Sequence, residues 1–359
     1  MAKRIEYVDI AKGFSILLVV IYHMANQDYS NEYPFFVEVN SYFSVFRMPF
    51  FFFMSGVFFS YSKSFMPFLL SKADVFLKPY FFVLTLLYVF NVIAYGDGAK
   101  LTVWGILYGN ASTITWAPMW FLTHLFVLYL FSYVVFVFFR FKQLNLTVGC
   151  LLLLATFSVG MFFFDLFWLY PISFGGEVFL MPGLPFSSDM LLVTAPFFIL
   201  GGLLRYYIVD FTPDLKVFFV SGFLFVVLCL FADADIEWTS RSIDGPFYML
   251  LGALSGIYIM LSFAFWISRF RFLSGIPLLL GRSSLFILIF HGFFLYRLTP
   301  LFDRLLSAYV GGFGVIILVL LFSLVVPMVI RWVVINSNYL SLFFLPVKNN
   351  KLFSKRQAV

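Results

Sequence analysis

Residues 4–23 read RIEYVDIAKGFSILLVVIYH, a charged segment followed by an apolar stretch that ends on a histidine. Asp9 and Lys12 stand at the start of the apolar stretch, and His23 stands at its end. A charge in or near the hydrocarbon of a membrane costs free energy unless another group pairs with it or uses it. The stretch therefore predicts a membrane-spanning helix whose ionisable residues are paired or functional.

The composition extends this expectation to the whole chain. Of its 359 residues, 63% are hydrophobic and 11% are charged, against about 25% charged residues in soluble domains. This composition excludes a soluble globular protein. Apolar stretches of about 20 residues are long enough to span a membrane. The fold class expected is an all-α polytopic membrane protein with ten transmembrane helices, at residues 10–27, 42–61, 76–96, 118–139, 144–164, 188–208, 216–232, 246–267, 276–296 and 309–333.

The basic residues test this count, because Lys and Arg favour the cytoplasmic side of a membrane. If the N-terminus is inside, the predicted inner segments hold sixteen Lys and Arg residues and the outer segments hold four. This asymmetry predicts cytoplasmic termini on a multi-pass protein of the cell's inner (cytoplasmic) membrane. The net charge of +6 then reflects membrane anchoring and not nucleic-acid binding. One membrane domain is expected over residues 1–345, followed by a basic cytoplasmic tail, 346–359.

Several other features of the sequence have plain interpretations. The flanks of the first helix do not resemble a cleaved signal peptide. Cys150 and Cys229 fall within predicted helices, so no disulfide framework is expected, and the three histidines lack the local spacing of a metal site. The outer loop at 165–187, rich in Gly and Pro, predicts an irregular but packed segment. Small residues at 55–56 and 201–202 predict close helix packing.

The ionisable residues left inside the predicted helices fall into two tiers. The inner tier holds Lys12 and Arg282 with Asp9 at its rim, and the outer tier holds His23, Arg47, His124 and His291. Lys12 and His23 are eleven residues apart, so they share one helix face about 16 Å from each other. An alternative is that Lys12 and His23 only extend to the inner and outer headgroups.

The first helix resembles that of the membrane acyltransferase-3 family, whose signature is Arg or Lys followed eleven residues later by His, here Lys12 and His23. The similarity looks closest to the fucose 4-O-acetylase-like branch and covers nearly the whole chain. Two positions depart from that branch, because Arg47 stands where it usually has His, and His124 where it has a small apolar residue. The other stretches that carry the resemblance are FRMPFFFFMSG (46–56), LKPYF (77–81), MWFLTHLF (119–126) and LGRSSLFILIFH (280–291).

The resemblance implies an enzyme that moves an acyl group, most often acetyl, from cytoplasmic acyl-CoA to a hydroxyl of a surface glycan or lipid-linked sugar. Acyl-CoA is then a co-substrate, with no bound cofactor expected. The cations available for its phosphates are Lys12, Lys78 and Arg282.

In the outer tier, His23 is expected to act as the general base, since histidine has an ordinary pKa of about 6.5. Arg47 is the residue best placed to stabilise the oxyanion, with Ser55 as a weaker candidate. Asp9 completes the expected catalytic set by pairing with Lys12 one turn away and orienting it.

Several alternatives remain open from the sequence. His124 has either a helix-packing or a catalytic role, and His291 is a candidate to contact the acceptor or the oxyanion. Trp120 either stacks on a sugar ring or anchors a helix at the membrane interface. The competing class is a transporter or exporter of a glycan intermediate or other small solute, but the sequence shows no internal repeat of the kind many transporters have. The expected partners are membrane lipids and the two substrates; the oligomeric state is left open.

Overall fold

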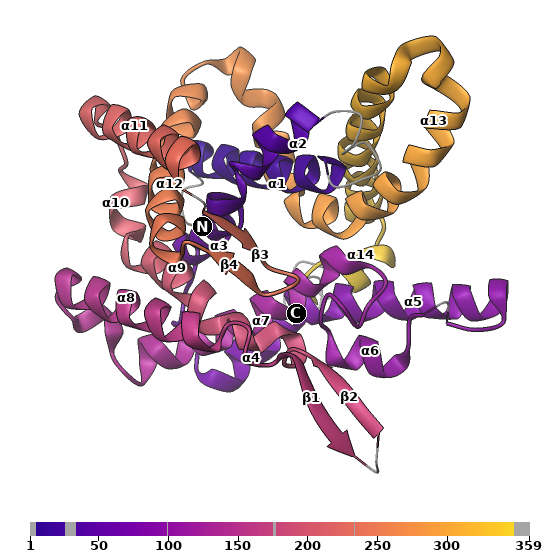
Figure 1. Cartoon of the computed structure of the whole chain (residues 1–359), viewed down its shortest axis with the longest axis horizontal. Coiled ribbons are helices and arrows are strands. Elements are labelled where there is room, and N and C mark those ends of the chain that lie inside the picture. Colours follow the sequence, from indigo (N-terminus) through magenta and orange to yellow (C-terminus); the bar gives the residue numbers. More distant parts are fainter. Residues whose placement is uncertain (1–4, 26–33, 99, 175–176, 233, 348–359) are drawn as a thin grey trace, which may run out of the picture. The chain divides into compact units, whose positions relative to one another are not determined.

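The computed structural model describes residues 5–25, 34–98, 100–174, 177–232 and 234–347 (Figure 1). The predicted basic tail lies outside the described residues from position 348 onward. The described chain is mostly helical, as expected. Its α-helices are α1 (Glu6–Ala25), α2 (Pro34–Ser41), α3 (Ser44–Val57), α4 (Phe65–Lys72), α5 (Lys78–Tyr95), α6 (Val103–Tyr108), α7 (Trp120–Val137), α8 (Leu146–Phe163), α9 (Leu191–Leu203), α10 (Arg205–Val209), α11 (Leu215–Phe231), α12 (Pro246–Ser268), α13 (Arg271–Asn336) and α14 (Leu340–Phe344).

Seven helical segments in the described residues are long and apolar enough to cross a membrane. One of them joins α4 to α5 through a π-helical turn, Ala73–Leu77. Two further apolar helices, α3 and α11, are shorter than 18 residues. The ninth and tenth predicted spans both fall within α13, whose helical geometry breaks at Gly311 with φ +69°. Ten spans and cytoplasmic termini therefore stay predictions.

Two β-hairpins add to the helices. The segment expected to be an irregular loop at 165–187 instead contains the antiparallel strands β1 (Trp168–Phe174) and β2 (Glu177–Pro182). A second, shorter hairpin joins β3 (Asp235–Glu237) to β4 (Ser242–Asp244), with Ile236 opposite Ile243. Helix periodicity and length identify the spans well, whereas hairpins this short carry little hydrophobic pattern.

The described chain divides into two compact units. The first contains residues 1–58 and 201–329, and the second contains residues 59–200 and 330–359. The single membrane domain expected over residues 1–345 stays a prediction.

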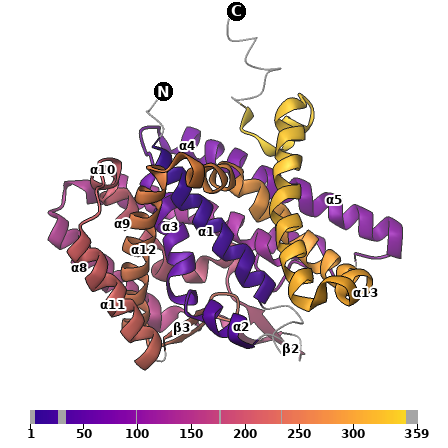
Figure 2. The same ribbon diagram turned by 90° about the horizontal axis from the view of Figure 1, so that it is seen from above.

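In the first unit, α1, α3 and α12 pack against one another (Figures 1 and 2). Glycines allow close approach to α3: a Cβ on Gly256 of α12 would overlap the ring of Phe46, and one on Gly201 of α9 would overlap the carbonyl of Phe53. The prediction of close packing at Gly201 is confirmed.

In the second unit, α7 packs against the π-helical turn after α4 and against a 3₁₀ turn at Pro185–Met190. Aromatic side chains dominate this packing. Phe198 lies 4.8 Å from Tyr129, and Tyr133 lies 4.6 Å from Phe68, measured between ring centroids.

Candidate active site

Helix α1 and the first part of α13 touch through their backbones. A Cβ added to Gly13 would overlap the carbonyl oxygen of Pro277, and one added to Gly281 would overlap the carbonyl oxygen of Asp9. Any larger side chain at either glycine would hold the helices apart. Glu6 and Asp9 stand in the first turn of α1, where acidic groups favour a helix start.

Further along, the same two helices meet again through histidines. His23 comes ten residues after Gly13, and His291 comes ten residues after Gly281. The two imidazole rings lie 5.2 Å apart between centroids, tilted by 43°. Ten residues of helix rise about 15 Å. The two contacts show that α1 and this part of α13 run side by side in the same direction.

Arg47 of α3 lies next to this pair and is only 3% exposed. Its guanidinium stacks 3.8 Å above the ring of Tyr22, and its Nη1 lies 3.5 Å from Oδ1 of Asn40. The Tyr22 ring is itself 5.1 Å from the His23 ring. The face of an aromatic ring attracts a cation, so Tyr22 links the cation of α3 to the histidine of α1.

The β3–β4 hairpin supplies carboxylates that the sequence interpretation missed. The Tyr22 hydroxyl donates a hydrogen bond to Glu237, and the Ser44 hydroxyl donates one to Asp235 over 2.5 Å. Both carboxylates attract the guanidinium of Arg47. The available signal was the acidic run DADIE at 233–237, in a chain with only 17 Asp and Glu residues.

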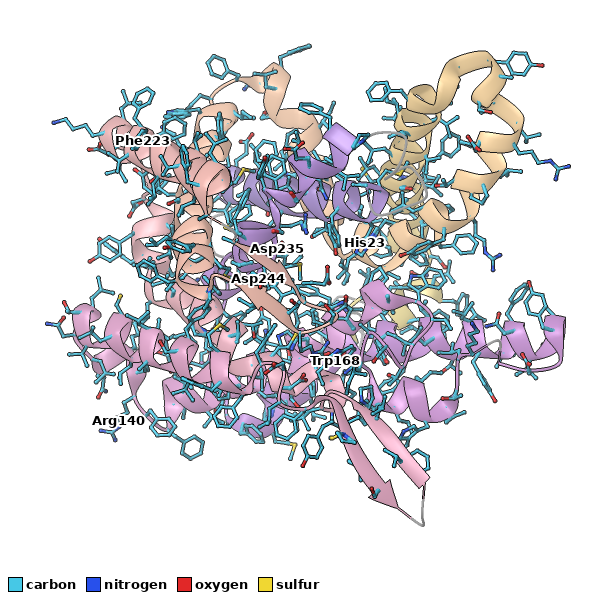
Figure 3. All side chains as sticks on the ribbon, viewed as in Figure 1. His23, Arg140, Trp168, Phe223, Asp235 and Asp244 are labelled. Atoms are coloured by element: carbon cyan, nitrogen blue, oxygen red, sulfur yellow. The ribbon has the colours of Figure 1, made fainter. Side chains whose placement is uncertain are left out.

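A pocket of about 320 Å³ lies beside the hairpin within the first unit. Its polar lining includes Asp235 and Asp244, which face each other across the two strands (Figure 3), together with Tyr42 and Tyr248. Phe225 is among the residues of its apolar lining. The pocket therefore combines hydrogen-bond acceptors with aromatic surface.

The predicted inner cations differ in their surroundings. The Lys12 ammonium lies 3.6 Å from the centroid of the Phe58 ring and is half-buried, on the helix face that it shares with His23. Arg282 follows the glycine of the crossing but is exposed, and His291 comes nine residues later, half a turn round the helix. Asp9 is buried in α1, and Ser55 is half-buried in α3. The expected ion pair between Asp9 and Lys12 stays a prediction.

His124 belongs to the second unit and is completely buried. Its Nδ1 donates to the carbonyl of Ser187 over 3.1 Å, and its Nε2 lies 3.0 Å from the hydroxyl of Thr194. With both ring nitrogens engaged, the arrangement supports the packing role for His124. Trp120 is buried with its ring 5.7 Å from that of His124, so it lacks the exposure of an interfacial anchor.

Lys78 also lies in the second unit, at the start of α5. Its ammonium donates to Asp74 over 2.5 Å and to the carbonyl of Leu345 over 2.6 Å. The other carboxylate oxygen of Asp74 accepts the backbone N–H of Val347. Lys78 thus holds the C-terminal segment to α5, and binding a CoA phosphate would require it to leave these partners.

The fold and the site define a helical membrane protein with histidines and an arginine gathered inside the apolar helices of one unit. The acyltransferase-3 family, described as an acyltransferase domain, matches residues 5–332, and the chain belongs to this family. It is a membrane acyltransferase. The likeness to the fucose 4-O-acetylase-like branch stays a prediction. No curated protein and no solved structure matches the chain.

Proposed function

We propose that this protein is an integral membrane O-acyltransferase that moves an acyl group, acetyl in the first instance, from cytoplasmic acyl-CoA to a hydroxyl of a surface glycan or lipid-linked sugar. It does so in the inner membrane of the cell, with ten spans and both termini cytoplasmic. The observation that carries the proposal is α1, which bears a cation near one end and a histidine near the other, on one face. The parallel contact with α13 brings a second histidine to the same level.

Lys12 binds the phosphate end of the donor. Its ammonium rests against Phe58, and a phosphate oxygen would accept a charge-assisted hydrogen bond from it. The extended pantetheine arm of CoA has a length of the same order as the separation of about 16 Å between Lys12 and His23. The thioester then lies near His23. Arg282, exposed near the glycine contact, is the second cation proposed for the phosphates, with Lys78 the third.

His23 acts as the general base at the thioester. It takes the proton of the acceptor hydroxyl while the hydroxyl oxygen attacks the thioester carbonyl. The tetrahedral intermediate then expels the CoA thiolate, which receives the proton from His23. Arg47 is the donor proposed for the oxyanion, since its guanidinium is held in place by Tyr22 and Asn40.

The pocket beside the β3–β4 hairpin is the entry proposed for the acceptor sugar. Carboxylates accept hydrogen bonds from sugar hydroxyls, and tyrosine rings stack on sugar faces. Asp235 lines the pocket and lies two residues from Glu237, which holds Tyr22 beside His23. The carboxylates of Asp235 and Asp244 carry the same sign of charge as a phosphate, so they would disfavour a phosphate or another anion in this pocket.

The test compares the purified protein with two variants, His23→Asn and Lys12→Ala. The purified wild-type protein should release free CoA thiol from acetyl-CoA. In cells that contain the wild-type protein, mass spectrometry should find an added acetyl mass on the surface glycans. His23→Asn should lower the transfer rate by about 10² to 10⁴ without changing CoA affinity, because Asn cannot accept the proton. Lys12→Ala should instead weaken CoA binding by about 1.5–3 kcal/mol, the worth of one hydrogen bond to a charged group.

A correctly inserted His23→Asn protein that transfers acyl groups at the wild-type rate would rule out the proposed base. Normal CoA binding by Lys12→Ala would remove this residue from the donor site. If wild type consumes no acyl-CoA but moves a glycan intermediate across vesicle membranes, the transporter alternative holds.

A further inference from the structure

The hydrogen bonds of His291 determine which of its nitrogens carries the proton. Its Nδ1 lies 2.7 Å from the carbonyl oxygen of Ile287 and 3.1 Å from that of Leu288. A carbonyl oxygen only accepts, so Nδ1 carries the hydrogen and Nε2 presents a lone pair. His291 is completely buried, and Nε2 has no hydrogen-bond partner among the described residues.

The ring of His291 lies beside that of the proposed base. The ring centroids of His23 and His291 are 5.2 Å apart. Two imidazoles joined by an N–H···N hydrogen bond of about 3 Å have ring centres about 5 Å apart. The two rings are thus spaced as in a hydrogen-bonded pair. They are tilted by 43°, so the ring of His23 has to turn for its N–H to point at Nε2 of His291.

We propose that His291 positions His23 by accepting its N–H, so that the other nitrogen of His23 faces the acceptor hydroxyl. This inference rests on the proposed function, in which His23 is the general base. The acceptor proton moves to the second ring nitrogen of His23 as the new C–O bond forms. His291 then holds the imidazolium until the C–S bond breaks and the CoA thiolate takes this proton from His23. An orienting hydrogen bond of this kind selects the tautomer of a catalytic histidine.

The charged and titratable groups around His23 come from several elements. Arg47 approaches from α3, Tyr22 lies on α1, and Glu237 on β3 holds the Tyr22 hydroxyl. Helix α12, which packs along α1, carries no charged residue or histidine. Among these groups His291 is the one that offers a buried, unpartnered acceptor.

The first experiment replaces His291 in two ways. His291→Leu keeps similar bulk but removes the acceptor, and His291→Gln keeps an amide oxygen near the position of Nε2. His291→Leu should lower kcat on the order of 10²-fold with KM for both substrates unchanged, and His291→Gln should recover most of this loss. In a His23→Ala background, His291→Leu should cause no further loss, because the two residues act as a unit. Equal losses in the Leu and Gln variants, a wild-type rate for His291→Leu, or additive effects would overturn the proposal.

A second measurement does not depend on activity. The chain has three histidines, so the imidazole nitrogens of protein labelled with ¹⁵N-histidine can be assigned with single substitutions. The proposal predicts a neutral His291 with hydrogen on Nδ1, and an Nε2 signal shifted by a hydrogen bond from His23. That shift should disappear in His23→Ala, while the signals of His124, which is bonded through both nitrogens, stay unchanged. An Nε2 signal that is the same with and without His23 would overturn the inference, even if the enzyme transfers acyl groups as proposed.

Discussion

Two cations inside the apolar helices lie against aromatic faces. The ammonium of Lys12 lies over Phe58 and the guanidinium of Arg47 over Tyr22. At desolvated sites such contacts contribute about 2 kcal/mol, which offsets part of the cost of placing a charge in an apolar helix. Lys78 is different, because a carboxylate and a carbonyl hold its ammonium.

Arg47→Lys tests the role of the stacked guanidinium. Lysine keeps the charge but lacks the planar group that stacks on Tyr22 and reaches Asn40. We expect kcat to fall by about 10- to 30-fold, the equivalent of about 2 kcal/mol of lost interaction. Steady-state kinetics in detergent or nanodiscs would measure it.

The matched control for this variant is Arg269→Lys. Arg269 also lies over an aromatic ring, 4.6 Å from the centroid of Phe265, but it is exposed at the end of α12. It should leave kcat unchanged. Similar losses in the two variants would show that the effect of Arg47→Lys is general to arginine–aromatic pairs and not specific to the site.

The position of α1 against α13 depends on two glycines and on the equal spacing from each glycine to its histidine. Glycine is required there because the opposing backbone carbonyls leave no room for a Cβ. The β3–β4 hairpin acts at the other end of α1, where Glu237 holds the ring on which Arg47 stacks. These elements together orient His23.

Gly281→Ala should disturb this arrangement. The new Cβ would overlap the carbonyl oxygen of Asp9 and force α1 away from α13, at a cost of about 1–3 kcal/mol for overpacking. We expect a lower Tm and a lower kcat, since His291 would move away from His23. Thermal unfolding monitored by fluorescence, together with the thiol-release assay, would measure both.

Gly275→Ala, in the same helix, is the matched control. A Cβ at Gly275 would meet no atom within 4 Å. Replacing a helical glycine by alanine favours the helix by about 0.5–1 kcal/mol. This variant should keep or slightly raise Tm and keep kcat. If both variants behave alike, the backbone contact at Gly281 does not determine the position of α1.

The residues that the sequence singled out are divided between the two units. Asp9, Lys12, His23, Arg47, Ser55, Arg282 and His291 belong to the first, whereas Lys78, Trp120 and His124 belong to the second. Within the first unit, the histidine and arginine contacts form one connected site. Within the second, His124 and Lys78 hold helices and the C-terminal segment together. The membrane topology decides which end of the site faces the cytoplasm and which end faces the outside of the cell.

Cysteine labelling tests this topology. In a Cys150→Ala/Cys229→Ala background, a membrane-impermeant maleimide added to intact cells should label Asn31→Cys and Arg304→Cys. Lys351→Cys should react only after permeabilisation, because the inner segments carry sixteen basic residues and the outer ones four. Positions 31 and 351 lie outside the described residues. Labelling of Lys351→Cys from outside would refute the ten-span count, and protection of Arg304→Cys would show that α13 does not cross the membrane twice.

The sequence by itself determined the membrane class, the main helices and the shared face of Lys12 and His23. These properties depend on composition and on the period of a single helix, which consecutive residues specify. It also identified the family, which the match over residues 5–332 confirmed.

Only the tertiary structure decided which groups meet. It paired His23 with His291, stacked Arg47 on Tyr22, and brought in the carboxylates of a hairpin that hydropathy does not reveal. It also gave Lys78 partners near the C-terminus. Contacts of this kind join residues far apart in the chain. They depend on how helix surfaces fit together and where glycines let backbones touch, and neither is a property of any one segment.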